Sequence, residues 1–512
     1  MSAVNFRPDQ FALAGYRIHY AWVIVFITAL MRLVSSSFRM SFPALVPIIS
    51  QVFGWSEGLI LFAFSLQWVV SGMFGPPSGW LGDRYGARFT LTLGASLYIV
   101  SMILAGFMTE LWHLYLFFGV MLSASMGIFQ VPLTVSVTSW FRRHLGLGMG
   151  LLQSSQGVGP VIVPAIMVGL VAFFSLGQGK AWADSLPIFS ADSIGIRMAF
   201  WIPGIVGGAV LLLLTRLFHN SPEDVGMRQL GADPNEPLRA APTTGRGAKE
   251  RARVFLRQAR KTPTFWNLVG IHYWGCAGHA IIIMFLQVMV VDLLRPEGGY
   301  QGVDKALVGA SAIGISIAGT MHLTSTITRF GAPIAADLLG SKWVMAACFT
   351  LQFVPVLILL FADQLWMFYL FAVLFGIGFG GEMSAFPIIN RQYYGRAPIG
   401  SAYGFQMMGA GAGMASGALL GSGLFIGVTE LGFPVILDNP YCWTILLSFV
   451  MSLGGVIAIL CLPNTHTHQL PDWEDELPPE FRTGAESTPP APAPSPAAPG
   501  TTPAPATSGN GD

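Results

Sequence analysis

Charged side chains are scarce in this chain of 512 residues. Lys and Arg number 27 and Asp and Glu 26, so 10% of the residues are charged, against roughly a quarter in a soluble globular domain. The net charge of +1 excludes the basic surface that nucleic-acid binding requires. Hydrophobic residues reach 53%. This balance excludes a soluble enzyme and a disordered chain, and it indicates an all-α polytopic membrane protein.

Cysteine and nucleotide-binding motifs are also lacking. The four cysteines stand in apolar runs without a Cys-x-x-Cys pair or a histidine at metal-ligand spacing, so neither a disulfide scaffold nor a metal site is expected. No phosphate-binding Gly-x-x-x-x-Gly-Lys-Ser/Thr loop occurs, which excludes ATP-driven pumping. No cluster of nucleophile and base stands out either. We therefore expect no enzyme activity and no cofactor.

Twelve apolar runs are long enough to cross a bilayer, which takes roughly 20 helical residues. The first run is too long for a cleaved signal peptide, so it is expected to remain as a membrane span. The runs lie near residues 20–47, 59–80, 89–108, 112–140, 145–174, 198–218, 266–292, 306–336, 343–362, 365–390, 400–426 and 441–462.

Lysine and arginine mark one side of these spans. Twenty lie on the side that holds both termini, four lie in the opposite loops, and three lie within spans. Because positive charge favours the cytoplasmic side, both termini are expected in the cytoplasm of a cell with the chain in its inner (plasma) membrane. The expected organisation begins with an N-terminal tail (1–18) and a first six-helix half (19–218). A central loop (219–263), a second six-helix half (264–462) and a C-terminal tail (463–512) follow.

The central loop and the C-terminal tail have distinct compositions. Residues 251–261 are basic and are expected to form an amphipathic helix on the anionic inner leaflet. The tail from Pro463 is acidic and then rich in Pro, Ala and Thr, so we expect it to be disordered.

The two halves repeat each other at an offset of 254 residues. Asp83 then falls on Asp337, Gly86 on Gly340 and Arg88 on Lys342, and Leu111-Trp112 falls on Leu365-Trp366. One ungapped offset predicts two parallel six-helix repeats. Such repeats are the geometry of transporters that rock one half against the other around a site at the membrane midplane.

The loop between the second and third spans carries a recognisable motif. It reads Gly79-Trp80-Leu81-Gly82-Asp83-Arg84-Tyr85-Gly86-Ala87-Arg88, with a degenerate copy around Asp337, Gly340 and Lys342. This motif resembles the signature loop of the major facilitator superfamily. An acid that faces cations across a tight glycine turn can act as a conformational latch. The alternative is that these charges only mark a cytoplasmic loop.

Further segments resemble one branch of that superfamily, the oxalate/formate antiporters and monocarboxylate transporters. They are His19-Tyr20-Ala21-Trp22, Phe53-Gly54-Trp55-Ser56, Ser221-Pro222-Glu223-Asp224-Val225-Gly226 and Tyr403-Gly404-Phe405-Gln406. The eleventh span carries a separate pattern, with glycine at positions 409, 413, 417 and 421. Such a row lets helix backbones approach closely.

Ionisable residues inside spans mark functional sites by default. At 1.5 Å per residue, Arg329 and Glu382 lie roughly 12–13 Å from the cytoplasmic end, and Arg32 lies at a similar depth in the first span. Arg39 lies closer to the external side, where its head group could instead snorkel out. Three arginines against one glutamate predict a cationic cavity, which suits a carboxylate because arginine binds it bidentately.

The branch resemblance implies that Arg329 is the substrate-binding arginine of span eight. Two departures from the branch limit this comparison. Oxalate exchangers carry a lysine on span eleven, which residues 400–426 lack, and monocarboxylate transporters carry an aspartate where this chain has Ser325. A structural ion pair remains the alternative for Arg329, and equally for Arg32.

Glu382 is the acid nearest mid-depth, and we expect it to couple protons to transport. The alternative is a static ion pair that locks helix packing. His322 lies two helical turns from Arg329 on the same face and, with Tyr273 and Gln406, is a candidate for the cavity lining. His272 and His279 could relay protons or simply pack.

These observations favour secondary active transport of a small organic anion by alternating access, as proton symport or anion exchange. The expected partners are that anion, protons and the lipid bilayer, with no nucleic acid and no obligate protein partner. The alternatives are an efflux transporter of drug-like or lipophilic compounds and a solute sensor without transport. A channel fits a duplicated chain less well.

Overall fold

The computed structural model describes residues 12–13, 16–17, 19–141, 145–180, 191–219, 222–232, 246–394, 397, 400–464 and 469–478. Within these residues, twelve helices are long and apolar enough to cross a membrane, as the sequence predicts. Strand structure in this part of the chain is limited to a two-residue antiparallel pair, β1 (Ala12–Leu13) with β2 (Tyr16–Arg17). The molecule is therefore a helical multi-pass bundle.

The N-terminal half opens with a broken first span. Pro43 and Pro47 interrupt it with a short 3-10 turn, because proline removes a backbone donor and clashes with the preceding turn. The elements are α1 (Tyr20–Ser41), η2 (Phe42–Leu45), α2 (Val46–Phe53), α3 (Glu57–Tyr85), α4 (Ala87–Gly106), α5 (Leu111–His113), η3 (Leu114–Leu122), α6 (Ser123–Trp140), α7 (Leu145–Ser175) and α9 (Ala191–Leu217).

The C-terminal half follows a connection that contains two short elements, η4 (Pro222–Val225) and α10 (Arg246–Ala259). Thr262 caps the start of α11 by accepting a hydrogen bond from the Phe265 amide. The elements are α11 (Pro263–Leu293), α12 (Lys305–Leu339), α13 (Ser341–Val356), η5 (Leu357–Leu360), α14 (Leu365–Tyr394), α15 (Gly400–Thr429), α16 (Cys442–Leu460) and η6 (Trp473–Glu476).

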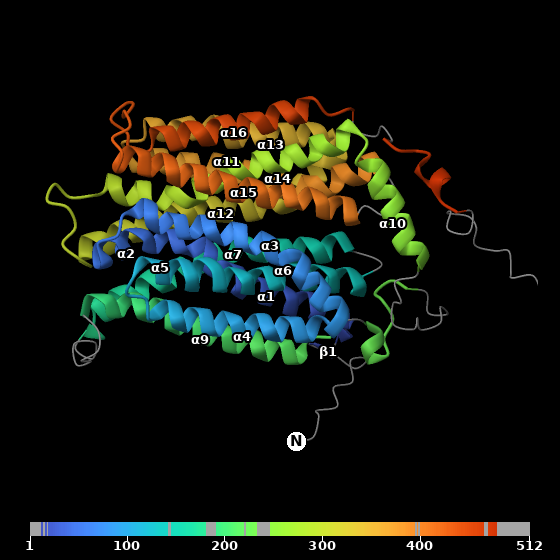
Figure 1. Cartoon of the computed structure of the whole chain (residues 1–512), viewed down its shortest axis with the longest axis horizontal. Helices are drawn as coiled ribbons and strands as arrows, with labels where there is room; N and C mark the ends of the chain where they lie inside the picture. The colour runs from blue at the N-terminus through green and yellow to red at the C-terminus, as the bar shows by residue number, and fades with distance from the viewer. Residues whose placement is uncertain are drawn as a thin grey trace, which may run out of the picture.

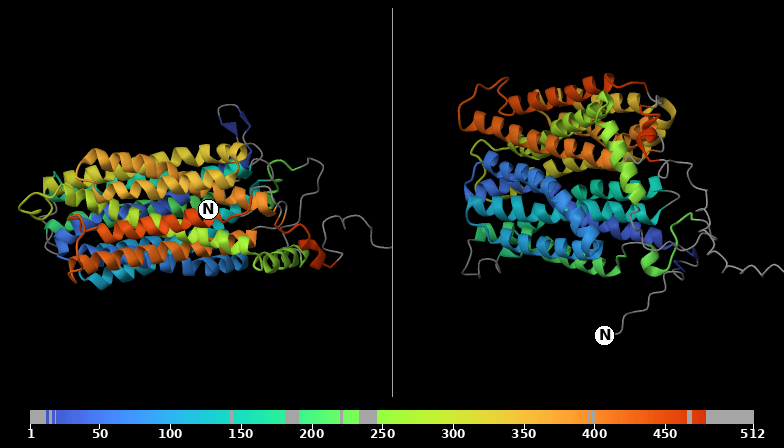
Figure 2. Two further views of the ribbon diagram at one scale, coloured as in Figure 1. Left: turned by 90° about the horizontal axis from the view of Figure 1, so that it is seen from above. Right: turned by 45° about the vertical axis from the view of Figure 1, so that its right-hand side comes forward.

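The helices lie side by side in two bundles (Figure 1). Helices α1 to α9 form one bundle and α11 to α16 the other, and the right-hand view of Figure 2 shows the same division. The bundles meet where α7 packs on α12 and where α3 packs on α15. The end of the molecule that carries β1, α10 and η6 is called the α10 end here, and the opposite end is called the outer end.

Matching glycine turns support the internal repeat. Gly86 precedes α4 with φ 85° and ψ 151°, and Gly340 precedes α13 with φ 86° and ψ 135°. Both angles lie in a region that residues with a side chain rarely adopt. The turn that links the second and third helices is therefore built the same way in both halves, as the offset of 254 residues predicts.

The glycine row of span eleven works as the sequence indicates. A Cβ atom added at Gly409, Gly413 or Gly417 would run into backbone atoms of α11. Glycine at these positions therefore lets α15 and α11 approach backbone to backbone.

The basic segment of the central loop is helical, but its surroundings differ from the expectation. One face of α10 packs against η6 rather than lying free for the leaflet: Val254, Phe255, Trp473 and Leu477 share a buried apolar cluster. Arg251 pairs with Glu474 at 2.6 Å and Arg257 with Glu476 at 2.8 Å. Residues 469–478 were expected to be disordered with the rest of the tail. That expectation is wrong for them, because their acidic side chains pair with arginines of α10 and Trp473 packs on its apolar face.

Candidate functional site

Arg32 lies buried in the N-terminal half, where α1 meets α6 and α7. Its Nη1 donates to the backbone oxygen of Gln130 at 3.3 Å. With the Gln156 amide turned so that its oxygen faces α1, that oxygen accepts from both Nε and Nη2 of Arg32. The guanidinium is thus held by neutral oxygen atoms, which leaves its charge available to the interior of the bundle.

Arg329 reaches the same turn of α7 from the other half. Its Nη1 donates to the backbone oxygen of Gln153 at 3.1 Å, and its Nε lies 3.4 Å from the Ser325 hydroxyl. The guanidinium carbon sits 5.6 Å from the centre of the Phe379 ring. Unlike Arg32, the Arg329 side chain is only half-buried. Two arginines from two halves therefore converge on Gln153 and Gln156.

Arg39 stays inside the bundle instead of snorkelling to the interface. Its side chain is 7% exposed, and its guanidinium carbon lies 4.4 Å from the centre of the Trp68 ring. Nε and Nη2 have no hydrogen-bond partner among the described residues. Trp68 in turn packs against the C-terminal half at Cys276, so Arg39 lies close to the contact between the halves.

Glu382 is fully buried in α14, on the side that faces α11 and α13. Its Oε2 accepts from Gln352 Nε2 at 2.6 Å and lies 3.5 Å from His279 Nδ1. The charge of Glu382 also acts on Arg329, and the Phe379 ring lies near Arg329 and near His279, the neighbour of Glu382. The three charges expected at one depth therefore have different partners: Arg32 and Arg329 meet at α7, whereas Glu382 contacts α11 and α13.

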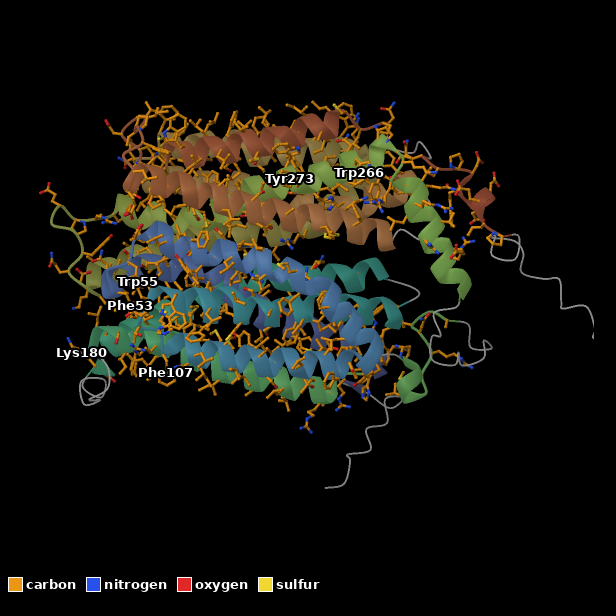
Figure 3. All side chains as sticks on the ribbon, in the orientation of Figure 1. Phe53, Trp55, Phe107, Lys180, Trp266 and Tyr273 are labelled. Atoms are coloured by element: carbon orange, nitrogen blue, oxygen red, sulfur yellow. The ribbon has the colours of Figure 1, made fainter. Side chains whose placement is uncertain are left out.

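The remaining lining candidates differ in their surroundings. His322 is buried, with its ring 6.3 Å from Phe379. The Tyr273 hydroxyl accepts from Ser416 at 3.1 Å, and Figure 3 shows Tyr273 further into the bundle than Trp266 on the same helix. Gln406 is fully buried and exchanges two hydrogen bonds of 2.9 Å with Asn390. That pairing ties α15 to α14 and favours packing over substrate contact for Gln406.

The predicted latch is described only in part. Gly79 lies within α3, and the side chains of Asp83, Arg84 and Asp337 lie outside the described part of the structure. Arg88 donates to the backbone oxygen of Arg216 at 2.9 Å, and Lys342 donates to that of Leu462 at 2.6 Å. Each cation therefore joins the start of its third helix to the end of the last helix in the same half.

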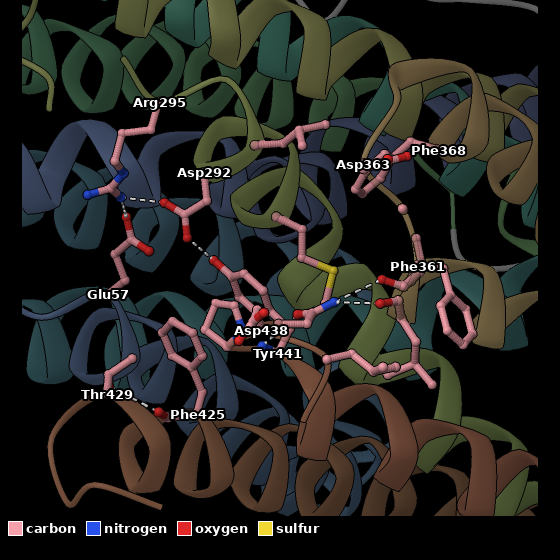
Figure 4. Close-up of a pocket in the computed structure, with 18 of the residues that line it drawn as sticks. Glu57, Asp292, Arg295, Phe361, Asp363, Phe368, Phe425, Thr429, Asp438 and Tyr441 are labelled. Carbon is pink, nitrogen blue, oxygen red and sulfur yellow. Dashed lines mark hydrogen bonds and ion pairs between the residues drawn. The ribbon is translucent and has the colours of Figure 1, made fainter. Parts of the chain in front are cut away.

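A cavity of about 1040 Å³ opens at the outer end. In Figure 4, Arg295 lies between Glu57 and Asp292, and the Tyr441 hydroxyl points at Asp292. Arg295 pairs with Glu57 of the other half at 3.8 Å and with Asp292 at closer range. Burial, with the charge of Asp292 as a second cause, raises the pKa of Tyr441 well above its ordinary value, so its hydroxyl keeps the proton that it donates to Asp292.

Sequence reasoning missed the neutral partners of the charged residues. Gln153, Gln156, Gln352, Trp68 and Phe379 carry no charge, so they do not stand out in an apolar span. Polar amides inside spans are nevertheless uncommon, and Gln156 and Gln352, which make their contacts through the side chain, were a usable signal. Gln153 contributes only its backbone oxygen.

Comparison with known proteins agrees with this architecture. A family model described as Major Facilitator Superfamily matches residues 24–335 and 300–501. Curated relatives include MFS-type transporter 1 of Ophiocordyceps (26% identical; 27% of this chain, 29% of the relative), human monocarboxylate transporter 14 (22%; 44% and 42%) and the agnestins efflux protein of Paecilomyces divaricatus (26%; 23% and 28%). The matched stretches thus span less than half of each relative.

Solved structures match over a longer part of the chain. The crystal structure of a nucleoside transporter superposes with a TM-score of 0.60 at 12% identity, covering 87% of this chain and 100% of that one. At this identity the likeness concerns the fold alone. The family match, the twelve helices and the shared architecture lead to one conclusion: the chain is a multi-pass membrane protein that belongs to the Major Facilitator Superfamily.

Proposed function

We propose that the chain is a secondary active transporter that moves a small organic anion, a carboxylate, across the membrane by alternating access. The observation that carries the proposal is the convergence of Arg32 and Arg329 on one turn of α7. Guanidinium groups bind carboxylates bidentately, and two of them reaching from opposite halves can hold one anion between the parts that move.

Charge balance supports an anion as the substrate. Arg32, Arg39 and Arg329 lie inside the bundle against Glu382, and the described partners of the first three are neutral oxygen atoms or aromatic rings. A carboxylate bound at Arg329 removes part of the excess positive charge from a region of low dielectric. His322 and Tyr273 are the further lining residues, and the likeness to a monocarboxylate transporter points the same way.

Glu382 is the group that we assign to proton coupling, for a symport of anion and proton; anion exchange is the other mode. Its charge acts on Arg329, so an anion that neutralises Arg329 makes the negative charge of Glu382 less favourable. Binding of the anion and of a proton then favour each other. The alternative is that Glu382 only locks α14 to α13 through Gln352.

The setting follows from the same proposal. The chain lies in the inner (plasma) membrane with the α10 end and both termini in the cytoplasm, in keeping with its Lys and Arg distribution. Its partners are the anion, protons and lipid, with no nucleic acid, cofactor or obligate protein partner. Gly79, Asp83, Arg84, Gly86 and Arg88, with Asp337, Gly340 and Lys342 of the second copy, act as a latch rather than at the substrate.

Efflux of drug-like or lipophilic compounds is the second candidate. The likeness to an efflux protein and the aromatic rings of Trp68 and Phe379 beside the arginines favour it. In that function the arginines only stabilise the bundle. A sensor without transport is the remaining alternative.

Uptake by purified protein in liposomes tests the proposal. Radiolabelled lactate, pyruvate, formate, oxalate and benzoate are offered to wild type, Arg329→Lys and the control Arg197→Lys. Arg197 is also buried, but it donates to the Gly106 backbone oxygen within the N-terminal half. Saturable uptake that is lost in Arg329→Lys and kept in Arg197→Lys supports the proposal. If no carboxylate is taken up by folded wild type, the efflux function replaces it.

A further inference from the structure

Several buried polar atoms without partners gather around Glu382. Among the described residues, neither ring nitrogen of His279 has a hydrogen-bond partner, and the same holds for Glu382 Oε1 and Gln352 Oε1. All three side chains are fully buried and come from α11, α13 and α14. Unsatisfied polar atoms in a buried site cost free energy, so such a cluster needs an occupant or a function.

The backbone of α11 makes room for this cluster. A Cβ atom at Gly275 would collide with Glu382 Oε1 and with the Phe349 ring. One turn further along α11, His279 places Nδ1 3.5 Å from Glu382 Oε2. The Glu382 carboxylate therefore lies against one face of α11, with one oxygen next to Gly275 and the other next to His279.

The Phe379 ring lies beside both this cluster and Arg329. Phe379 precedes Glu382 by three residues on α14, so both lie on the same side of the helix. Its ring centre lies 4.8 Å from that of His279 and 5.6 Å from the guanidinium carbon of Arg329. The ring thus lies beside both the histidine of the cluster and the arginine, and the charge of Glu382 acts on Arg329.

We propose that His279 and Glu382 together form the binding site for the transported proton, with His279 as the second proton-binding group. The proposal deepens the proposed function and rests on it. The pair is neutral when it holds one proton and carries one negative charge without it. A neutral pair is the favoured form in a buried site unless a cation stands nearby.

The surrounding groups make Arg329 that cation. The titratable neighbours are Cys276 on α11, Cys348 on α13, and His322 and Arg329 on α12. Arg329 is the permanent positive charge among them. A carboxylate bound to Arg329 neutralises its charge, and the His279–Glu382 pair then takes up a proton. By linkage, loss of that proton lowers the affinity for the anion by the same factor by which the anion raises the affinity for the proton.

Two transport assays separate the inference from the function on which it rests. Counterflow of a carboxylate at equal pH on both sides needs no net proton transfer, whereas accumulation against a gradient does. For a one-to-one symporter, a gradient of about one pH unit sustains about tenfold accumulation. The variants are Glu382→Gln, His279→Gln and the control His272→Gln. His272 lies two helical turns before His279 on α11, where its ring stacks on Phe386.

We expect His279→Gln and Glu382→Gln to lose accumulation, from about tenfold to about onefold, while counterflow continues. His272→Gln should retain both. Accumulation by His279→Gln at the wild-type level would overturn the inference, and so would loss of accumulation in His272→Gln. Wild type that shows counterflow without accumulation overturns the inference but leaves anion exchange standing. Absence of counterflow in wild type contradicts the proposed function itself.

A measurement on wild type alone guards against misfolded variants. In weakly buffered detergent solution, binding of the carboxylate should remove about one proton from the medium for each anion bound. No change in proton concentration on binding would overturn the inference. A transition metal bound in a one-to-one ratio to purified wild type and absent from His279→Gln would also overturn it, since the pair would then hold a metal.

Discussion

The contacts described for Arg32, Arg329 and Arg39 are with neutral groups. Arg32 binds Gln130 and Gln156, Arg329 binds Gln153 and Ser325, and Arg39 stacks on Trp68. A guanidinium paired with a buried carboxylate would be neutralised already and would gain little from an anionic ligand. A neutral partner fixes the geometry of a guanidinium without neutralising its charge.

Gly275→Ala tests how tightly the Glu382 carboxylate is seated. The added Cβ collides with Glu382 Oε1 and Phe349, and overpacking of this kind costs about 1–3 kcal/mol of stability. We expect a lower Tm in a thermal melt. Gly270→Ala on the same helix is the matched control, because its Cβ would meet nothing within 4 Å and should leave Tm unchanged or raise it.

Gln406 and Asn390 offer a test of packing against substrate contact. Gln406→Ala leaves the buried Asn390 amide without two partners, which costs about 1–3 kcal/mol. Asn390→Ala should cost a similar amount, and the double variant less than the sum, because the two residues share their bonds. A Gln406→Ala protein of unchanged stability and much weaker carboxylate uptake would return Gln406 to the substrate site.

The residues of the site could be predicted in part. Arg32, Arg39, Arg329 and Glu382 stand out from the sequence because an ionisable group in an apolar span is unusual. Their partners could not be predicted, since they depend on helix rotation: Glu382 faces His279 and Gln352, and Arg32 faces α7 instead of Glu382. A depth estimate of 1.5 Å per residue gives no information about rotation.

At the scale of elements, helices were easier to predict than what covers them. The apolar runs predict the twelve spans, because the thickness of the bilayer sets the length of a span. The glycine residues predict the turns between helices at Gly86 and Gly340. The basic segment gives α10, but not its contact with η6. That contact depends on three side-chain hydrogen bonds and one ring contact between segments more than 200 residues apart in the sequence.

Trp473→Ala should release the segment 469–478 from α10. Trp473 stacks edge-on against Phe255, lies 5.0 Å from the Arg251 guanidinium carbon and is buried with Val254. Amide hydrogen exchange in α10 is expected to rise after the substitution. Hydrogen bonds from Gln258 and Arg257 lower the pKa of Glu476, so the docked state should also weaken as pH falls through that lowered value. Unchanged exchange in the variant would show that α10 holds its place without the tail segment.

At the scale of the whole molecule, the described helices form two bundles that pack on each other along α7 with α12 and along α3 with α15. Between them lie the α7–α12 contact at the arginines and, at the outer end, the ion pair of Glu57 with Arg295. An ion pair that links moving parts stabilises the conformation in which it forms. We therefore expect the Glu57–Arg295 pair to favour closure of the outer end.

Glu57→Gln removes that pair and should shift the population toward an open outer end by up to about fivefold, since a partly exposed ion pair contributes about 0.2–1 kcal/mol. Spin labels at Gln51 and Glu430, which line the outer cavity from the two halves, report the change as a longer distance. The exchanged pair Glu57→Arg with Arg295→Glu should restore the shorter distance. A distance distribution that is the same in all three proteins would mean that the pair has no part in closure.

The central claim is that Arg329 binds the carboxylate of the substrate, and ligand-induced stabilisation tests it most directly. Purified protein is melted with increasing amounts of a transported carboxylate or of its uncharged primary amide, because a ligand that binds only the folded state raises Tm. We predict that the carboxylate raises Tm in wild type and in Arg197→Lys, that the amide does not, and that Arg329→Lys responds to neither. Equal stabilisation by the amide, or a full carboxylate response in Arg329→Lys, would contradict the account.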